Sequence, residues 1–322
     1  MNTPILLITF NRPGHTRKVL ESILSVSPLE LYVFQDGKRT GNEQDALKCS
    51  AVREVVHELT NKSSTLLHTF YAETNLGCGP GPATAISWFF QHVDQGIIIE
   101  DDAVPHSDFF HYSEELLERY RDDFKVRAIG SMNVDLHPWG DGSYYFSQMN
   151  RNLCAWATWK RAWEDFDIRM RGVSRHDLSK ALCRYHCGVM EREYWCDRLD
   201  EVHRNGCDGK SWDMQFLMSI WLHQGKGIIP NVNLSSNIGT GLDATHVMDV
   251  GNIIDNIPSG PILPLSHPSS TDIQFEADRQ FHAMYFEPFR KHWKWYKIAY
   301  YLINKRIKKF IGHEGPWIRR TP

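Results

Sequence analysis

The sequence predicts an α/β fold with a mostly parallel, Rossmann-like sheet flanked by helices. Short runs of apolar and β-branched residues alternate with segments of helical spacing through residues 5–100, and the runs end in polar or glycine-containing turns. The composition, 42% hydrophobic and 23% charged, is that of a globular protein. Alternation of this kind builds parallel sheets, in which ligands bind beyond the carboxyl ends of the strands.

The elements are expected in the following order. Strands are predicted at residues 5–10, 29–35, 65–71 and 96–99, and helices between them at residues 16–25, 45–59 and 83–92. Helices are then predicted at residues 109–120, 177–204 and 211–223, and strands at residues 127–132, 227–230 and 232–234. The Pro-rich segment 258–268 is expected to be a linker or a strap over the surface.

Polar residues stand at the end of each of the first four strands. They are Asn11 with Arg12, Asp36 with Gly37, Asn75 through Gly77, and Glu100 with Asp101 and Asp102. The last three are consecutive carboxylates that repel one another, and a divalent cation carrying a phosphate would offset that repulsion. An acidic loop without a ligand is the alternative. Pro105 is expected to stop any ladder after this strand.

Several other motifs have two interpretations each. The glycine loop at residues 75–82 lacks the spacing of a dinucleotide fingerprint and has no Walker lysine, so a connector is the simpler interpretation. The Trp-rich stretch at residues 154–163 is expected to pack in the core or to offer a sugar platform. Asp213 stands at a helix start, where it could cap the helix or act in catalysis. His246 ends a polar loop and is either a surface residue or a ligand of a metal or phosphate.

Charge and cysteine usage suggest where the chain works. Seven cysteines without a secreted-domain spacing favour reduced thiols in a cytosolic protein; a zinc site near Cys183 and Cys187 is the alternative, without the usual C-x2-C pairs. No apolar run is long enough for a signal peptide or a spanning helix. Residues 290–322 are rich in Lys and Arg, and their aromatic residues recur at helical spacing. This basic tail predicts binding to an anionic inner membrane surface. One alternative is a helix packed on the body of the protein, and the other is nucleic-acid binding. Because no recognition fold precedes the tail, no nucleic-acid partner is expected.

In these residues the chain resembles the GT-A-fold nucleotide-diphospho-sugar glycosyltransferases. Residues 8–13 resemble the first strand and uridine loop of bacterial family-2-like transferases. Four blocks resemble the inverting N-acetylglucosaminyltransferase that begins complex N-glycans, in the same order along the chain. They are residues 35–37, residues 100–110 with the three acids, Trp212 with Asp213, and residues 230–246. The chain departs from the bacterial relatives at Pro80, Gly81 and Pro82, where they often carry a basic residue.

The resemblance implies a role for each matching residue. Asp102 is expected to hold Mn²⁺ or Mg²⁺, with His246 on the metal or phosphate side, and Asp213 to be the catalytic base. Arg12 and Asp36 are expected at the uracil end of the donor, and Glu100 and Asp101 at the ribose, the sugar hydroxyls or metal-bound water. The expected donor-binding set is completed by Thr9, Asn11, Asn75 and Gly77. The expected sugar platform consists of Trp156 and Trp212.

The resemblance also implies a domain plan and an activity. Residues 1–105 would be the nucleotide-sugar-binding half, residues 106–262 the acceptor and catalytic half of the same GT-A domain, and residues 263–322 a strap and a basic amphipathic helical tail. The expected activity is metal-dependent, inverting transfer of a sugar from a UDP donor to a hydroxyl of a glycan or lipid-linked acceptor. A retaining transferase on the same fold is one alternative. A sugar nucleotidyltransferase or a non-catalytic sugar-nucleotide-binding protein is the other.

Overall fold

The computed structural model describes residues 1–149, 155–185, 187–205, 212–239 and 257–290, together with residues 299 and 303. The chain divides into two compact units, Met1–Phe275 and Glu276–Pro322. The described part of the second unit is mostly helix α9 (Phe275–Arg290). All of the features below belong to the first unit.

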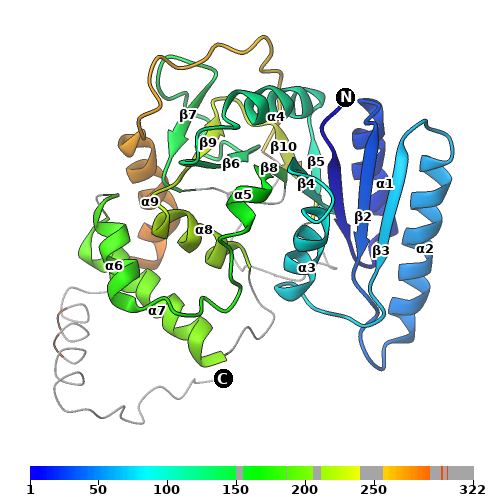
Figure 1. The fold of residues 1–322 in the computed structure, drawn as a ribbon, viewed down its shortest axis with the longest axis horizontal. Helices are drawn as coiled ribbons and strands as arrows, with labels where there is room; N and C mark the ends of the chain where they lie inside the picture. Colours follow the sequence, from blue (N-terminus) through cyan, green and yellow to red (C-terminus); the bar gives the residue numbers. More distant parts are fainter. Residues whose placement is uncertain are drawn as a thin grey trace. The chain divides into compact units, whose positions relative to one another are not determined.

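A large mixed sheet forms the centre of the first unit. In the described residues it has eight strands in the order β3-β2-β1-β4-β8-β6-β9-β7, and Figure 1 shows it running from β3 on the right to β7 on the left. The strands are β1 (Ile5–Thr9), β2 (Glu30–Gln35), β3 (Leu66–Tyr71), β4 (Gln95–Glu100), β6 (Val126–Gly130), β7 (Tyr144–Ser147), β8 (Ala155–Trp159) and β9 (Lys226–Pro230). Strands β1 to β4 are parallel, as the sequence predicts. The apolar runs of β1, β2 and β4 are buried on both faces, which is typical of parallel sheets, whereas the edge strand β3 is partly exposed.

Helices cover both faces of the sheet. The chain forms α1 (Pro13–Ser25), α2 (Glu43–Thr60), α3 (Pro80–Phe89), α4 (Ser107–Arg119), α5 (Lys160–Trp163), α6 (Arg175–Cys183), α7 (Val189–Asn205) and α8 (Asp213–Leu222). Successive residues of β1 point to opposite faces, so Ile5 and Leu7 join one core cluster and Leu6 and Ile8 the other. The first cluster includes side chains of α1, α2 and α4, and the second includes side chains of α3 and α8. The fold is therefore the predicted α/β class, with a sheet between two helical layers.

Several features differ from the sequence prediction. Residues 232–234 are not a strand, and the nearby strand is β10 (Ser235–Asn237). Strand β8 lies within the Trp-rich stretch and runs antiparallel between β4 and β6. A small ribbon that the sequence did not predict pairs β5 (Ala103–Pro105) with β10 (Ser235–Asn237); it ends at Pro105, as expected, opposite Ser235. The single helix expected at residues 177–204 is two helices, α6 and α7. A capping box of Ser174 and Asp177 begins the first of them.

The Pro-rich segment at residues 258–268, expected to be a linker or a strap, packs on the surface of the first unit as a strap. The backbone N–H groups of Ile262 and Leu263 donate to one oxygen of Asp108, at 2.9 and 3.2 Å. Further along, Ser266 accepts a hydrogen bond from Ser143 N. The segment is thus fixed to the loops around α4 and β7.

Candidate functional site

The candidate site lies at the topological switch point of the sheet, where the strand order reverses. Strand β1 is followed by β2 and β3 on one side, whereas β4 pairs with β1 on the other side. The connections leave in opposite directions and open a crevice at the carboxyl ends of the two strands, where α/β sheets bind ligands. Ile8 pairs with Glu100, so the residues that follow β1 and β4 lie side by side there.

Asp101 joins the two strand ends. The carboxylate is buried with 7% exposure, and its Oδ2 accepts a hydrogen bond from the backbone N–H of Phe10 at 3.2 Å. Arg12 Nη1 lies 3.7 Å from Asp101 Oδ1. Burial and the neighbouring charge of Asp102 raise the pKa of Asp101 to about 7, and Arg12 opposes that rise.

Asp102 carries an unsatisfied oxygen. Arg12 Nη1 donates to Asp102 Oδ2 at 3.3 Å, but Oδ1 is buried and has no hydrogen-bond partner among the described residues. A buried carboxylate oxygen without a partner is costly, and a bound cation would satisfy it. The described residues contain no group of three or more His, Cys, Asp or Glu residues able to hold a metal ion. A cation at Asp102 would therefore take most of its ligands from a bound substrate or water, as Mg²⁺ does at phosphate sites.

Glu100 and Asp213 extend the acidic cluster. Burial raises the pKa of Glu100 well above its ordinary value, and the charges of Asp102, Asp101 and Asp213 add to the rise. Asp213 is the exposed first residue of α8. Its electrostatic effect on Glu100 places the proposed base in the same cluster as the three strand-end acids, more than 100 residues away in the sequence. The expected group of four acids is thus brought together, with Arg12 as the cation beside it.

Asp36, Asn75 and Gly77 form a structural clamp. Asp36 is buried, and its two oxygens accept four hydrogen bonds from Gly37 N, Leu76 N, Gly77 N and Asn75 Nδ2, at 2.8 to 3.0 Å. A carboxylate has about four acceptor positions, so these bonds use them all. In this structure Asp36 fixes the loop after β3 to the end of β2. A direct bond to a uracil would require one of these four to break.

Thr9 and Asn11 also bond within the protein. Thr9 Oγ1 donates to the carbonyl oxygen of Phe34 at 3.0 Å, and Asn11 Nδ2 donates to Asp45 Oδ1 at 2.8 Å. Asp45 was not anticipated as part of this site. It also binds Arg39 through Nε and Nη2, at 2.6 and 2.9 Å, and Arg39 holds the pKa of Asp45 down to about 2. The available signal was Asn42, whose side chain caps α2 by accepting from Asp45 N.

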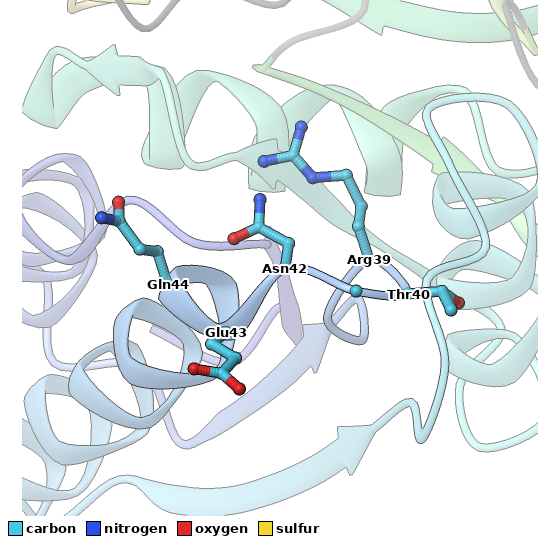
Figure 2. A pocket seen from close by; sticks show the side chains of 6 residues that line it. Arg39, Thr40, Asn42, Glu43 and Gln44 are labelled. Atoms are coloured by element: carbon cyan, nitrogen blue, oxygen red, sulfur yellow. The ribbon is translucent and has the colours of Figure 1, made fainter.

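A shallow hollow lies over the start of α2. It is lined by residues 39–44 (Figure 2). Arg39 and Asn42 point to one side of the loop in this view, whereas Glu43 points away. Because Asp45 binds both Asn11 and Arg39, the loop after β1 is tied to this hollow.

The two tryptophans expected to form a sugar platform are buried. Trp156 has no exposed surface and Trp212 has 4%. Their rings stack with centroids 5.8 Å apart and planes 27° apart, and Phe216 packs against both. The core-packing interpretation therefore describes both rings in this structure.

The chain after β10 packs directly on Asp102. Ile238 N donates to the carbonyl oxygen of Asp102 at 2.7 Å, and a Cβ on Gly239 would lie 2.5 Å from Asp102 Oδ2. His15, which sequence reasoning did not select, binds the Ile238 carbonyl oxygen through Nε2 at 3.0 Å. The expected ligand His246 lies outside the described residues, as does nearly all of the basic tail at 290–322. No helix in the described part of the chain is long and apolar enough to cross a membrane.

Comparisons with known proteins give little beyond the fold. No family model and no curated protein sequence matches the chain. Among solved structures, 4-diphosphocytidyl-2C-methyl-D-erythritol synthase from Anaerococcus prevotii is 8% identical, with 51% of this chain and 74% of that one covered and a TM-score of 0.31. An apo UDP-glucose pyrophosphorylase is 9% identical, with 73% and 94% covered and a TM-score of 0.36. A UDP-glucose pyrophosphorylase bound to UDP-glucose is 8% identical, with 51% and 79% covered and a TM-score of 0.30. Structural similarity at these TM-scores does not support a conclusion about the function of this chain.

Proposed function

We propose that the chain is a metal-dependent glycosyltransferase. It would move a sugar from a nucleotide-diphosphate donor, UDP in the first instance, to a hydroxyl of a glycan or lipid-linked acceptor with inversion at the anomeric carbon. The observation that carries the proposal is the buried Asp102 oxygen without a partner, which lies in a cluster of four acids at the crevice between β1 and β4. Such a cluster is stable at neutral pH when a cation enters it.

The donor would lie across the carboxyl ends of β1, β2 and β4. Asp102 would hold Mn²⁺ or Mg²⁺, which supplies positive charge for the departing diphosphate when it is bound. Arg12, whose Nη1 lies 3.3 Å from Asp102 Oδ2, keeps that carboxylate oriented. The hollow at residues 39–44 and the loop clamped by Asp36 would form the nucleoside end. Asp36 acts there by fixing main-chain groups in place.

Asp213 is the proposed general base. Its side chain is exposed, on the first turn of α8, and its charge acts on Glu100. In the proposed reaction the acceptor oxygen bonds to the anomeric carbon, the bond from that carbon to the diphosphate breaks, and the acceptor proton passes to Asp213. An inverting displacement needs one base on the face opposite the leaving group. The electrostatic effect of Asp213 on Glu100 supports its assignment to this role.

Donor binding is the first test. The full chain is screened by thermal shift with UDP-, GDP- and dTDP-sugars, with and without Mn²⁺. At about 100 times Kd, a donor adds about 2.7 kcal/mol to the free energy of unfolding. We expect one nucleotide class to raise Tm only with Mn²⁺, and Asp102→Asn to abolish that rise. Glu164→Gln, at the exposed residue just after α5, should keep it. A metal-independent response, or a normal response in Asp102→Asn, would contradict the assignment of Asp102.

Turnover separates the alternative activities. A glycosyltransferase releases a nucleoside diphosphate from the donor, whereas a nucleotidyltransferase forms a nucleotide sugar from a nucleoside triphosphate and releases pyrophosphate. We expect the former, and Asp213→Asn to keep the Mn²⁺-dependent Tm rise while it lowers kcat at least about 100-fold. Proton NMR of the product anomer distinguishes inversion from retention. Pyrophosphate release would favour the nucleotidyltransferase, and normal turnover in Asp213→Asn would remove this residue from the mechanism.

The basic tail is proposed to bring the chain to the inner membrane surface, next to a lipid-linked acceptor. The support is the sequence alone, in which Lys and Arg alternate with aromatic residues from 290 to 311. Flotation with phosphatidylserine-containing liposomes compares the full chain with a chain that ends at residue 289. Equal flotation of the two would eliminate the idea.

A further inference from the structure

A loop on the far side of the acidic cluster has no role in the proposal above. It comprises residues 131–142, which leave the end of β6, and we call it the Asn-anchored loop. Strand β8 is antiparallel to both β4 and β6, so β4 and β6 run in the same direction. The loop therefore emerges at the same edge of the sheet as the acids that follow β4. The nucleoside end of the site lies on the opposite side of β4, beyond β1.

Two asparagine side chains hold this loop in place. Asn231, just after β9, donates from Nδ2 to the carbonyl oxygens of Trp139 and Gly142 at 2.9 and 2.8 Å, and its Oδ1 accepts from Trp139 N at 2.8 Å. Asn133 is fully buried and donates from Nδ2 to the carbonyl oxygens of His137 and Asn231, at 3.1 and 3.3 Å. The loop is therefore fixed by side chains rather than by a sheet ladder, a rigid support of the kind that binding sites need.

The tip of the loop is exposed and strained. Leu136 is 56% exposed and has a φ of 52°, a backbone region that residues other than glycine seldom adopt. His137 is exposed, Trp139 is partly exposed, and their rings meet edge to face with centroids 4.6 Å apart. Strain of about 1–3 kcal/mol in an exposed segment is typical of positions that bind a ligand. Aromatic faces at such a tip suit the apolar faces of sugar rings.

The polar groups of the loop point to the same ligand class. Asn133 Oδ1, an acceptor, and Trp139 Nε1, a donor, are both buried without a hydrogen-bond partner among the described residues. A cation would match only the acceptor, and an anion only the donor. A hydroxyl group both donates and accepts, so it could satisfy either atom.

A short strand connects the loop with the acidic cluster. At one end of β10, the hydroxyls of Ser131 and Ser235 are 2.6 Å apart, and Leu234 N donates to the carbonyl oxygen of Ser131. At the other end, Ile238 N donates to the carbonyl oxygen of Asp102. Three extended residues separate these contacts, a span of about 10 Å. The base of the loop, at Ser131, is therefore about 10 Å along β10 from the contact with Asp102.

We propose that the Asn-anchored loop is a carbohydrate-binding subsite that holds the acceptor, with Trp139 and His137 as the ring contacts. That the bound sugar is an acceptor rests on the proposed function; that the loop binds carbohydrate does not. Asn133 and Asn231 are positioning residues that hold the two rings. The subsite would take over the role of sugar platform that the sequence analysis assigned to Trp156 and Trp212.

Binding is tested without donor or metal. Saturation-transfer NMR with chitobiose, cellobiose, lactose and maltose is run on the full chain in the presence of a chelator. We expect transfer to the ring protons of at least one disaccharide, and an affinity about tenfold weaker in Trp139→Ala, the scale of a lost aromatic contact. Trp139→Phe should restore most of the affinity because it keeps a ring face. Trp88→Ala, which removes a partly exposed indole on α3, should leave the affinity unchanged.

The outcomes separate this inference from the proposed function. Absence of transfer from all four disaccharides, or wild-type affinity in Trp139→Ala, overturns the subsite. His137→Ala, at the exposed tip, provides the same test should Trp139→Ala fail to fold, and unchanged affinity there is equally decisive. Disaccharide binding in a chain that shows no Mn²⁺-dependent response to any donor would leave the subsite standing and remove the glycosyltransferase.

Discussion

Gly239→Ala tests the packing of the chain against Asp102 most directly. The added methyl carbon would lie 2.5 Å from Asp102 Oδ2, 2.9 Å from its Cβ and 3.0 Å from its Cγ. Ordinary contacts of this kind begin near 3.4 Å. Because Ile238 N is hydrogen-bonded to the carbonyl oxygen of Asp102, the backbone on both sides is held in place. The side chain of Asp102 must therefore move by about 1 Å, since that is the overlap to be relieved.

A displacement of that size has a calculable effect. A 1 Å misplacement of a catalytic group can cost about 100-fold in rate, which corresponds to about 2.7 kcal/mol in the activation free energy. Overpacking also lowers the free energy of unfolding by about 1–3 kcal/mol. We expect kcat/KM to fall about 100-fold and the Mn²⁺-dependent Tm rise with donor to shrink or vanish.

The assay compares Gly239→Ala with Gly188→Ala, whose added methyl would contact nothing within 4 Å. Both variants are measured for kcat/KM, for Tm and for the Mn²⁺-dependent response to donor. A Gly239→Ala chain with wild-type donor affinity and turnover would show that the position of Asp102 does not matter. The metal assignment would then be wrong.

Three further predictions concern the framework of the site. Arg39→Gln should lower the free energy of unfolding by about 1 kcal/mol at pH 7, because the largely exposed Arg39 stabilises the ionised form of Asp45. The folded-state pKa of Asp45 is about 2, so protonation of Asp45 at low pH removes this stabilisation. In urea unfolding, the difference between variant and wild type should therefore fade as the pH drops from about 4 toward 2. Asp36→Asn should lower the free energy of unfolding by about 1–3 kcal/mol, because the new amide N–H₂ group would face hydrogen-bond donors of the loop at residues 75–77. Chemical denaturation measures this change, and an unchanged unfolding midpoint would argue against the clamp. Trp156→Ala should cost about 3–5 kcal/mol because the ring is fully buried, and calorimetry that found wild-type stability would contradict its core position against Trp212.

The local part of the fold could be predicted from the sequence. Strands β1, β2 and β4 are mostly apolar runs with polar ends, and burial on both faces of a parallel sheet requires that pattern. Strand β8 could not be predicted in this way, because its pairing with β4 depends on partners about 60 residues apart and its Trp side chains fit a core or a surface equally well.

The site was predictable in position but not in detail. The acids after β4 stand out because consecutive carboxylates at a strand end are unusual. The saturation of Asp36 by four donors depends on the path of the loop at residues 75–77, which composition does not reveal. Among the tryptophans, no sequence pattern distinguishes the partly exposed Trp139 from the buried Trp156. Trp156 is buried because it lies on the central strand β8, whereas Trp139 lies on a loop that Asn231 holds in place.

The antiparallel insertion of β8 has a consequence for synthesis of the chain on the ribosome. The edge of β4 that β8 covers includes Ile97, Ile98 and Ile99, and it stays open until residues 155–159 have emerged. An open edge of β-branched residues is a template for pairing with other chains. A nascent chain that ends before β8 should therefore need a chaperone, and a fragment of residues 1–105 should aggregate. The four parallel strands β1 to β4 therefore depend on a strand that is made later.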